Sequence, residues 1–173
     1  MEDLIQNLRN KKFQIELPSH LWKTFDANVL NILQTAQWKT FKYFSSYGTI
    51  NSAITSVDNK KGGIYIFYVD PHIIPERQRV LMYVGEAHIT DDQNLRKRIS
   101  EYKGYLPPDC RRPKIRTMLK EWWEDLYCSY IELDDNKLIL EIETELINKL
   151  ILPFNDKIPD KKIGCAVKAA GLQ

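Results

Sequence analysis

Four residues of this chain carry side chains that together could act on a phosphodiester bond. Tyr65 and Tyr83 lie in two short apolar segments, and Arg98 and Glu143 interrupt two apolar helical patterns further along. A carboxylate can hold a divalent metal ion and an arginine can bind a phosphate. A tyrosine hydroxyl can orient or deprotonate a water, although a phenol ordinarily ionises near pH 10, so that as a base it needs a nearby cation. The residue types therefore suit metal-assisted phosphodiester hydrolysis.

The two tyrosines are predicted to lie on neighbouring strands. Segments 63–69 and 80–84 are apolar on both alternating faces, as expected of strands that are covered on both sides. The ten residues between them contain two prolines and several charges, which favours a surface loop joining antiparallel strands. A third strand is predicted over 126–133. We therefore expect an α/β (α+β) fold with a small, mostly antiparallel, three-stranded central sheet flanked by helices.

The arginine and the glutamate are predicted to lie on helices. Residues 91–103 have apolar residues on the same helical stripe as Arg98, and residues 137–151 have the same pattern around Glu143, with Leu140 on its face. Helix 112–124 lies between them. A buried charge costs several kcal/mol unless it is paired, hydrogen-bonded or bound to a metal. Two interpretations stay open, a structural salt bridge between Glu143 and Arg98 or a shared functional site.

The chain divides into three parts. Residues 1–61 are predicted to be an N-terminal helical extension and linker, with a helical apolar stripe over 21–44 and a polar segment over 45–61. Residues 62–156 contain the predicted sheet and its helices, and residues 157–173 form a basic tail. The N-terminal helices are interpreted as a cover for the main domain, or as a target-recognition or dimer element.

Composition excludes several classes of protein. With 173 residues and a net charge of +2, the chain can bury one core, and its charge alone does not indicate nucleic acid. The three cysteines are far apart and have no zinc-type spacing. No apolar run approaches the roughly 20 residues of a membrane span. We expect a soluble, cytoplasmic protein with no membrane partner.

The spacing of these residues resembles that of a known nuclease family. Two triplets are similar to the signature of the GIY-YIG nucleases, namely Gly63-Ile64-Tyr65 and Tyr83-Val84-Gly85. The helix with Arg98 resembles the family's arginine helix, and Tyr102 follows four residues later, where family members carry Tyr or His. Glu143 and Asn155 resemble the family's metal-binding glutamate and terminal asparagine. These landmarks occur in family order over about residues 62–156.

The resemblance implies a role for each of these residues. Glu143 would hold one Mg²⁺ or Mn²⁺ ion, and Arg98 would bind a phosphate oxygen and offset the charge that develops on it. Tyr65 or Tyr83 would activate the attacking water, while Tyr102 and Asn155 would position groups by hydrogen bonds. The implied activity is that of a GIY-YIG-type endonuclease, a metal-binding phosphodiester hydrolase.

Two positions depart from the family pattern. Glu86 follows the second triplet, where the family often has lysine, and Pro153 lies one residue closer to Asn155 than in related repair nucleases. The glutamate leaves open which cation neutralises the substrate phosphate near the second triplet. Lys61, Arg79 and Lys97 are the candidates.

The predicted partner is DNA. Residues 94–120 contain nine Lys and Arg against only Glu101 and Asp109, an excess able to follow a phosphate backbone. The expected DNA contacts lie on the arginine helix and on the proline-rich loop and helix after it, at Lys97, Arg111, Arg112, Lys114 and Arg116.

Three functions remain as alternatives. The first is a DNA endonuclease of restriction, mobile-element or defence type, with a homodimer as an open alternative to a monomer. The second is a structure-selective repair or recombination nuclease. The third is a nucleic-acid-binding module that keeps the fold without cutting, for which Glu86 is the hint.

Overall fold

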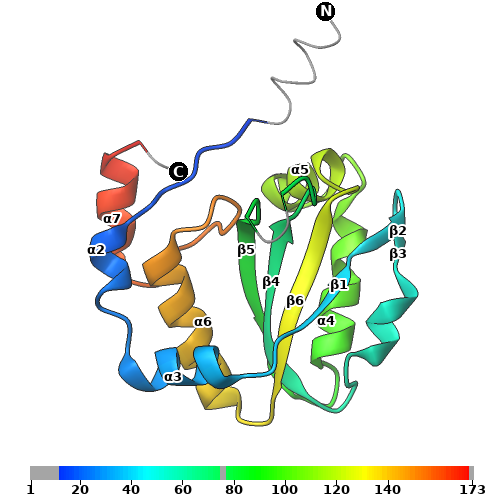
Figure 1. Cartoon of the computed structure of the whole chain (residues 1–173), viewed down its shortest axis with the longest axis horizontal. Helices are drawn as coiled ribbons and strands as arrows, with labels where there is room; N and C mark the ends of the chain where they lie inside the picture. The colour runs from blue at the N-terminus through cyan, green and yellow to red at the C-terminus, as the bar shows by residue number, and fades with distance from the viewer. Residues whose placement is uncertain (1–11, 75–76, 172–173) are drawn as a thin grey trace, which may run out of the picture.

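A four-stranded antiparallel sheet stands at the centre of the protein, with helices on both of its faces (Figure 1). This computed structural model describes residues 12–74 and 77–171. Outside these ranges lie the first eleven residues of the expected N-terminal extension, two residues of the expected hairpin loop and the last two of the tail. The central sheet has the order β1-β6-β4-β5, with β1 Lys39–Lys42, β4 Gly62–Val69, β5 Val80–Ala87 and β6 Leu126–Leu133. Strands β2 Phe44–Ser46 and β3 Thr49–Ile50 form a separate hairpin.

The helices follow the caps that the sequence supplies. Acidic or amide side chains accept hydrogen bonds from first-turn N–H groups at the starts of α3, α4, α6 and α7, at Asp26, Asn94, Asp135 and Asp160 respectively. The helices are α2 Ser19–Trp22, α3 Ala27–Thr35, α4 Leu95–Glu101, α5 Pro113–Glu121, α6 Asn136–Leu150 and α7 Lys161–Ala169, with 3₁₀ turns η1 Ser52–Ser56 and η2 Tyr102–Tyr105.

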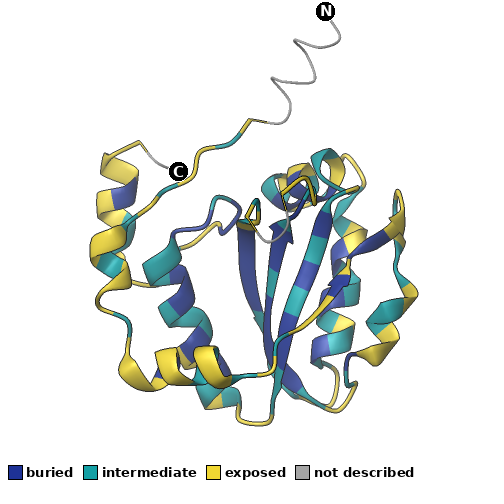
Figure 2. Cartoon of the chain, viewed as in Figure 1, coloured by how far each residue is buried: buried dark blue, intermediate teal, exposed yellow. Residues whose placement is uncertain are grey.

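The sheet separates two hydrophobic cores. Side chains that alternate along β4 and β5 point to opposite faces, so Tyr65 and Tyr83 face α4 and α5, while Ile64 and Val84 face α6. Figure 2 shows the buried central strands between helices whose outer faces are exposed. Strand β5 is an edge strand, and this position decides where the site lies.

The expected three-stranded sheet is wrong in the number of strands. The predicted helical stripe over 21–44 ends at Thr35, and residues 39–42 instead form β1, which pairs with β6 from Lys39↔Tyr130 to Lys42↔Tyr127. Phe41 buries its ring in the core while its strand neighbours are exposed, which is the alternation of a half-covered strand. This part of the expected N-terminal extension therefore belongs to the central sheet.

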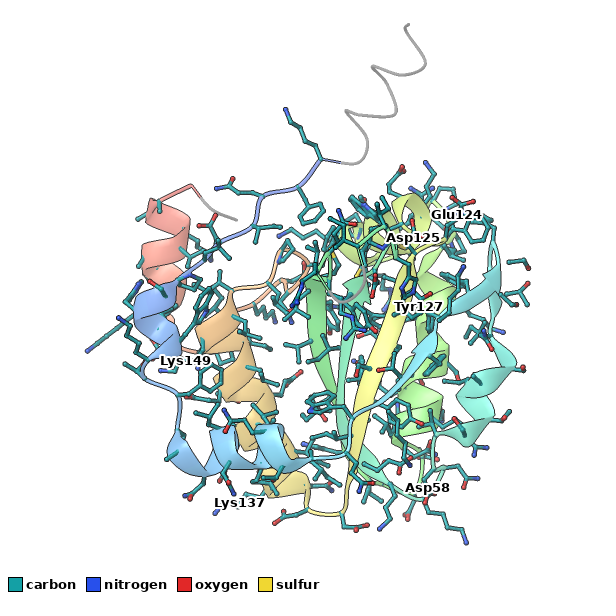
Figure 3. All side chains as sticks on the ribbon, viewed as in Figure 1. Asp58, Glu124, Asp125, Tyr127, Lys137 and Lys149 are labelled. Atoms are coloured by element: carbon teal, nitrogen blue, oxygen red, sulfur yellow. The ribbon has the colours of Figure 1, made fainter. Side chains whose placement is uncertain are left out.

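The segment before β1 covers the outer side of α6. Lys149, labelled on α6 in Figure 3, donates a 2.9 Å hydrogen bond to the Thr24 hydroxyl. The Asp26 N–H donates to Glu145 at 2.8 Å. In the described residues, then, the N-terminal helices cover the main domain, as one of the sequence interpretations had it.

The expected basic tail contains a helix, α7, which begins after the Asp160 cap. Within residues 12–74 and 77–171, no helix combines the length and the apolar character that crossing a membrane requires.

Candidate active site

Three tyrosines named by the sequence form one cluster on the α4 side of the sheet. The ring centroids of Tyr65 and Tyr102 are 5.7 Å apart, as are those of Tyr83 and Tyr102, and Tyr65 lies 6.4 Å from Tyr83. The hydroxyls of Tyr65 and Tyr102 share a 2.8 Å hydrogen bond. Tyr65 and Tyr102 are fully buried, whereas Tyr83 keeps 6% of its surface exposed.

Gly85 creates the space that the Tyr65 hydroxyl occupies. Tyr65 pairs across the sheet with Gly85, so a side chain at position 85 would point to the same face. A Cβ at that position would lie 2.5 Å from the Tyr65 hydroxyl oxygen and 2.9 Å from the Tyr83 ring. The absence of a side chain at this point of β5 therefore lets the Tyr65 hydroxyl reach the edge of the sheet.

Arg98 reaches this cluster from α4. Burial by itself lowers the pKa of Arg98, but the phenols of Tyr65 and Tyr102 outweigh that effect and raise it, with a hydrogen bond to Tyr65 contributing. The side chain is 33% exposed and lies 3.4 Å from Glu101, one turn further on. Arg98 and Glu143 are not within ion-pair distance of each other among the described residues. The structural salt bridge between them is therefore not what explains the two interrupted stripes.

Glu143 lies on α6, on the other side of the sheet from the tyrosines. Burial raises the pKa of its carboxyl from 4.5 to about 7, the negative charge of Glu86 adds to this effect, and Arg98 opposes it. The Arg98 charge thus acts on Glu143 although the two helices lie on opposite faces. Both helices contact β5, which is the edge strand of the sheet.

Glu86 faces Glu143 because it shares the α6 side of β5 with Val84. One buried carboxylate oxygen of Glu86, Oε2, has no hydrogen-bond partner in the described residues. The Nε2 atom of His88 lies 3.6 Å from it and also lacks a hydrogen-bond partner there. Two carboxylates that face each other and include an unpartnered buried oxygen are suited to a cation.

These residues fit a weakly held Mg²⁺ or Mn²⁺ ion better than a dedicated metal cage. No group of three or more His, Cys, Asp or Glu side chains gathers around a common point within residues 12–74 and 77–171. Mg²⁺ keeps several waters and is commonly bound by one or two carboxylates together with substrate phosphates. Glu143, with Glu86 beside it, supplies that kind of ligand set.

Arg112 lies in the site, whereas the sequence placed it on a loop that contacts DNA. Its guanidinium carbon lies 5.5 Å from the ring centroid of Tyr83 and 5.6 Å from that of Tyr105. It also contacts Asp156 at 3.4 Å. The local sequence does not predict that Arg112 contacts Tyr83, because this contact depends on how the proline-rich loop folds back over Tyr83.

The cations that the sequence offered in place of the family lysine have other partners. Lys61 pairs with Asp134 and Arg79 with Asp70, at 2.5 and 2.9 Å. Lys97 donates to the backbone carbonyl of residue 92. In the part of the chain that the structure describes, Arg112 and Arg98 contact the tyrosine cluster.

Asn155 acts on the backbone of β5. Its side-chain oxygen accepts from the Val84 N–H at 3.0 Å, and its side-chain nitrogen donates to the Val84 carbonyl at 2.8 Å. The Phe154 N–H donates to the Met82 carbonyl at 3.1 Å. Asn155 therefore holds the edge strand that carries Tyr83 and Gly85, which is a positioning role.

The remaining predicted DNA contacts divide into two groups. Arg116 donates to the Leu106 carbonyl at 3.0 Å and so supports the loop. Lys97 and Arg111 are exposed, and Lys114 is partly exposed.

A basic groove formed by the predicted basic tail begins beside Arg112. It has a volume of about 440 Å³ and starts at Asp156, the partner of Arg112. Three exposed lysines line it, from the segment after Asn155 and from α7: Lys157, Lys161 and Lys168.

Comparison with protein-family models, with curated proteins and with solved structures gave no match to this chain.

Proposed function

We propose that this chain is a metal-dependent endonuclease that hydrolyses phosphodiester bonds in DNA. The observation that carries the proposal is the convergence, at the edge strand β5, of phenol, guanidinium and carboxylate groups from four separate elements. Tyr65 and Tyr83 come from the sheet, Arg98 from α4 and Glu143 from α6. The GIY-YIG resemblance supports the same activity.

Arg98, the pair of buried tyrosines and a metal ion at Glu143 would each act on the substrate phosphate. Arg98 is cationic at every working pH and partly exposed, so it can bind a non-bridging phosphate oxygen and offset the charge that grows during attack. The buried hydrogen bond between Tyr65 and Tyr102 fixes the wall of the site against which the phosphate would lie. A Mg²⁺ or Mn²⁺ ion bound at Glu143 would polarise the scissile phosphate and stabilise the leaving oxygen.

The cations near the site would bind DNA without distinguishing its base sequence. Lys97, Arg111 and Lys114 on one side and the basic groove on the other would contact phosphates, which positions DNA but does not specify bases. The biological role that we propose for this activity is of restriction, mobile-element or defence type.

Cleavage of supercoiled plasmid tests the proposal. The purified protein is incubated with plasmid with Mg²⁺, with Mn²⁺ and with EDTA, and nicked and linear products are measured on gels. We expect cleavage with either metal and none with EDTA or with Glu143→Gln. Glu141→Gln serves as the matched control, since Glu141 is an exposed glutamate on the same helix. Plasmid binding with no cleavage under any metal condition would refute the endonuclease and favour the non-cleaving module.

A further inference from the structure

Arg112 is held at the edge of the tyrosine cluster by its surroundings. Its guanidinium carbon lies 5.5 Å from the ring centroid of Tyr83 and 5.6 Å from that of Tyr105, so both rings border it. Pro113 follows at once as the first residue of α5 and restricts the backbone conformation of the residue before it. The side chain is 24% exposed. Arg112 is therefore held in place and is still accessible to a substrate.

The hydrogen-bond donors of Arg112 are only partly used. A guanidinium carries five N–H donors in a planar fork. One nitrogen of Arg112 contacts the carboxylate of Asp156 at 3.4 Å, and the guanidinium also interacts with the Tyr83 hydroxyl. A close arginine–carboxylate pair has distances of about 2.7–2.9 Å and often two parallel hydrogen bonds. The contact with Asp156 is longer and involves one nitrogen, so the fork can bind a further anion.

Arginines that support the fold nearby have closer partners. Arg96 donates to two backbone carbonyls at 2.6 and 2.7 Å, and Arg116 donates to another at 3.0 Å. Arg98 resembles Arg112 instead, because its carboxylate contact also involves one nitrogen at 3.4 Å and its side chain is also partly exposed. Long carboxylate contacts and partial exposure therefore distinguish the two arginines at the tyrosine cluster from arginines that hold loops in place.

The guanidiniums of Arg98 and Arg112 both act on Tyr83, which is the member of the cluster with some exposed surface. Arg112 lies against its ring, and Arg98 interacts with it electrostatically. The two cations come from separate elements, α4 and the residue before α5. A phosphodiester presents two non-bridging oxygens, and negative charge grows on them during attack, so two converging arginines can each bind one oxygen.

We propose that Arg112 is a catalytic residue that forms, together with Arg98, a two-arginine clamp on the scissile phosphate. This inference rests on the proposed endonuclease function. Arg98 binds one non-bridging oxygen, and Arg112 binds the other. The water oxygen forms a bond to phosphorus, and the bond from phosphorus to the leaving sugar oxygen breaks. One water proton is released to solvent, and the leaving oxygen takes up one from solvent. Arg112 transfers no proton, and its hydrogen bonds stabilise the charge that grows on the phosphate oxygen.

The kinetics of plasmid cleavage with Mg²⁺ test this role. Arg112→Ala should lower kcat by about 100-fold or more, a larger factor than any rise in KM, because the lost interaction is strongest in the transition state. Arg112→Lys keeps the charge without the planar fork and should lie between the wild type and Arg112→Ala. Guanidinium chloride at millimolar concentration should restore part of the Arg112→Ala rate, because the free ion can occupy the place of the missing side chain.

Two matched variants separate this role from DNA contact and from folding. Arg111→Ala removes the neighbouring exposed arginine and should act mainly on KM, with no rescue by guanidinium. Lys137→Ala removes an exposed cation on α6 and should change neither kcat nor KM. If Arg112→Ala raises only KM, Arg112 contacts DNA without acting in the reaction, and the inference is wrong. A loss of kcat that neither lysine nor guanidinium reduces would indicate a structural role and would equally overturn it.

A readout without DNA or metal keeps the clamp distinct from the endonuclease. The arginine side-chain N–H signals are followed by ¹⁵N NMR as inorganic phosphate is added in EDTA, and the two relevant signals are assigned with Arg98→Lys and Arg112→Lys. Both should shift with the same midpoint, whereas the Arg96 signal should not move. A shift at Arg98 alone, or at neither arginine, would overturn the clamp even in a protein that cuts plasmid. Shifts at both in a protein that does not cut would support a shared phosphate site and overturn the catalytic role together with the endonuclease.

Discussion

Glu143→Gln should stabilise the folded protein while abolishing cleavage. Burial and the charge of Glu86 raise the pKa of Glu143 from 4.5 to about 7. Because the folded value lies above the unfolded one, the folded protein binds more protons between these pH values. The contribution of Glu143 to stability is therefore fully present below pH 4.5 and is lost as the pH rises through 7.

The size of this effect follows from the pKa shift. The full shift corresponds to about 3 kcal/mol of unfolding free energy, and screening of a partly exposed carboxyl reduces it to about 2 kcal/mol. Glutamine has the same shape without the charge, so the variant should gain this amount at about pH 8.5 and almost nothing at about pH 4.5. Such a gain at alkaline pH would mean that the charged Glu143 carboxylate costs the folded protein stability, as expected of a buried charge without an ion-pair partner.

Urea unfolding at a series of pH values, followed by fluorescence in metal-free buffer, measures the difference. Glu141→Gln is the control, because it makes the same substitution at an exposed position of the same helix. A Glu143→Gln protein less stable than the wild type at about pH 8.5, or a difference that does not change with pH, would refute the reasoning. Added Mg²⁺ should stabilise the wild type and not the variant, because the charge that favours the ion is then absent.

Three further outcomes follow from the geometry. Gly85→Ala should lower the unfolding free energy measured in urea by about 1–3 kcal/mol and remove most of the cleavage activity, because the new Cβ overlaps the Tyr65 hydroxyl. The control Gly104→Ala should be near neutral, because its Cβ meets nothing within 4 Å. Equal losses in the two variants would contradict the packing argument. Asn155→Ala should lose about 1–3 kcal/mol, since the buried Val84 N–H loses its acceptor; a stability unchanged in urea would contradict this. A variant with alanine at all three groove lysines, Lys157, Lys161 and Lys168, should bind plasmid with a slope of log K against log salt that is smaller by about 2–3. An unchanged slope would mean that the groove does not contact DNA.

The strands and helices that carry the site could be predicted from local pattern. Both β4 and β5 are apolar on both faces, which correctly indicates strands covered on both sides, and α6 has a clear cap and a helical stripe. The same pattern predicts a central position for both strands, which is wrong for β5, because β5 is an edge strand. The interruption of that stripe by Glu143 correctly indicated a charge at a partly buried position. Leu140, placed on the same face by the pattern, is 49% exposed, whereas Ile142 is buried. The buried face of α6 therefore includes Ile142 and leaves out Leu140.

The parts that could not be predicted depend on contacts between distant residues. The pattern over residues 39–42 predicts helix because it continues the stripe of α3, but pairing with β6 overrides that local preference and forms β1. Arg112 is one of nine cations in its stretch of sequence, and only the folded loop distinguishes it from Arg111. The hydrogen bonds of Asn155 to Val84 join residues 71 positions apart.

The edge of the sheet explains why these residues meet where they do. At a central strand, the sheet lies between the side chains of its two faces, so a cation on one face and a carboxylate on the other cannot contact the same substrate group. Strand β5 is an edge, and at Gly85 it leaves room for the Tyr65 hydroxyl on the face of the tyrosines. Arg98 and Arg112 approach from one face and Glu143 with Glu86 from the other. An unprotected edge would expose unpaired backbone groups, and Phe154 and Asn155 bond to part of it. The segment that bonds to this edge continues to Asp156, which contacts Arg112, and Arg112 in turn contacts the Tyr83 ring.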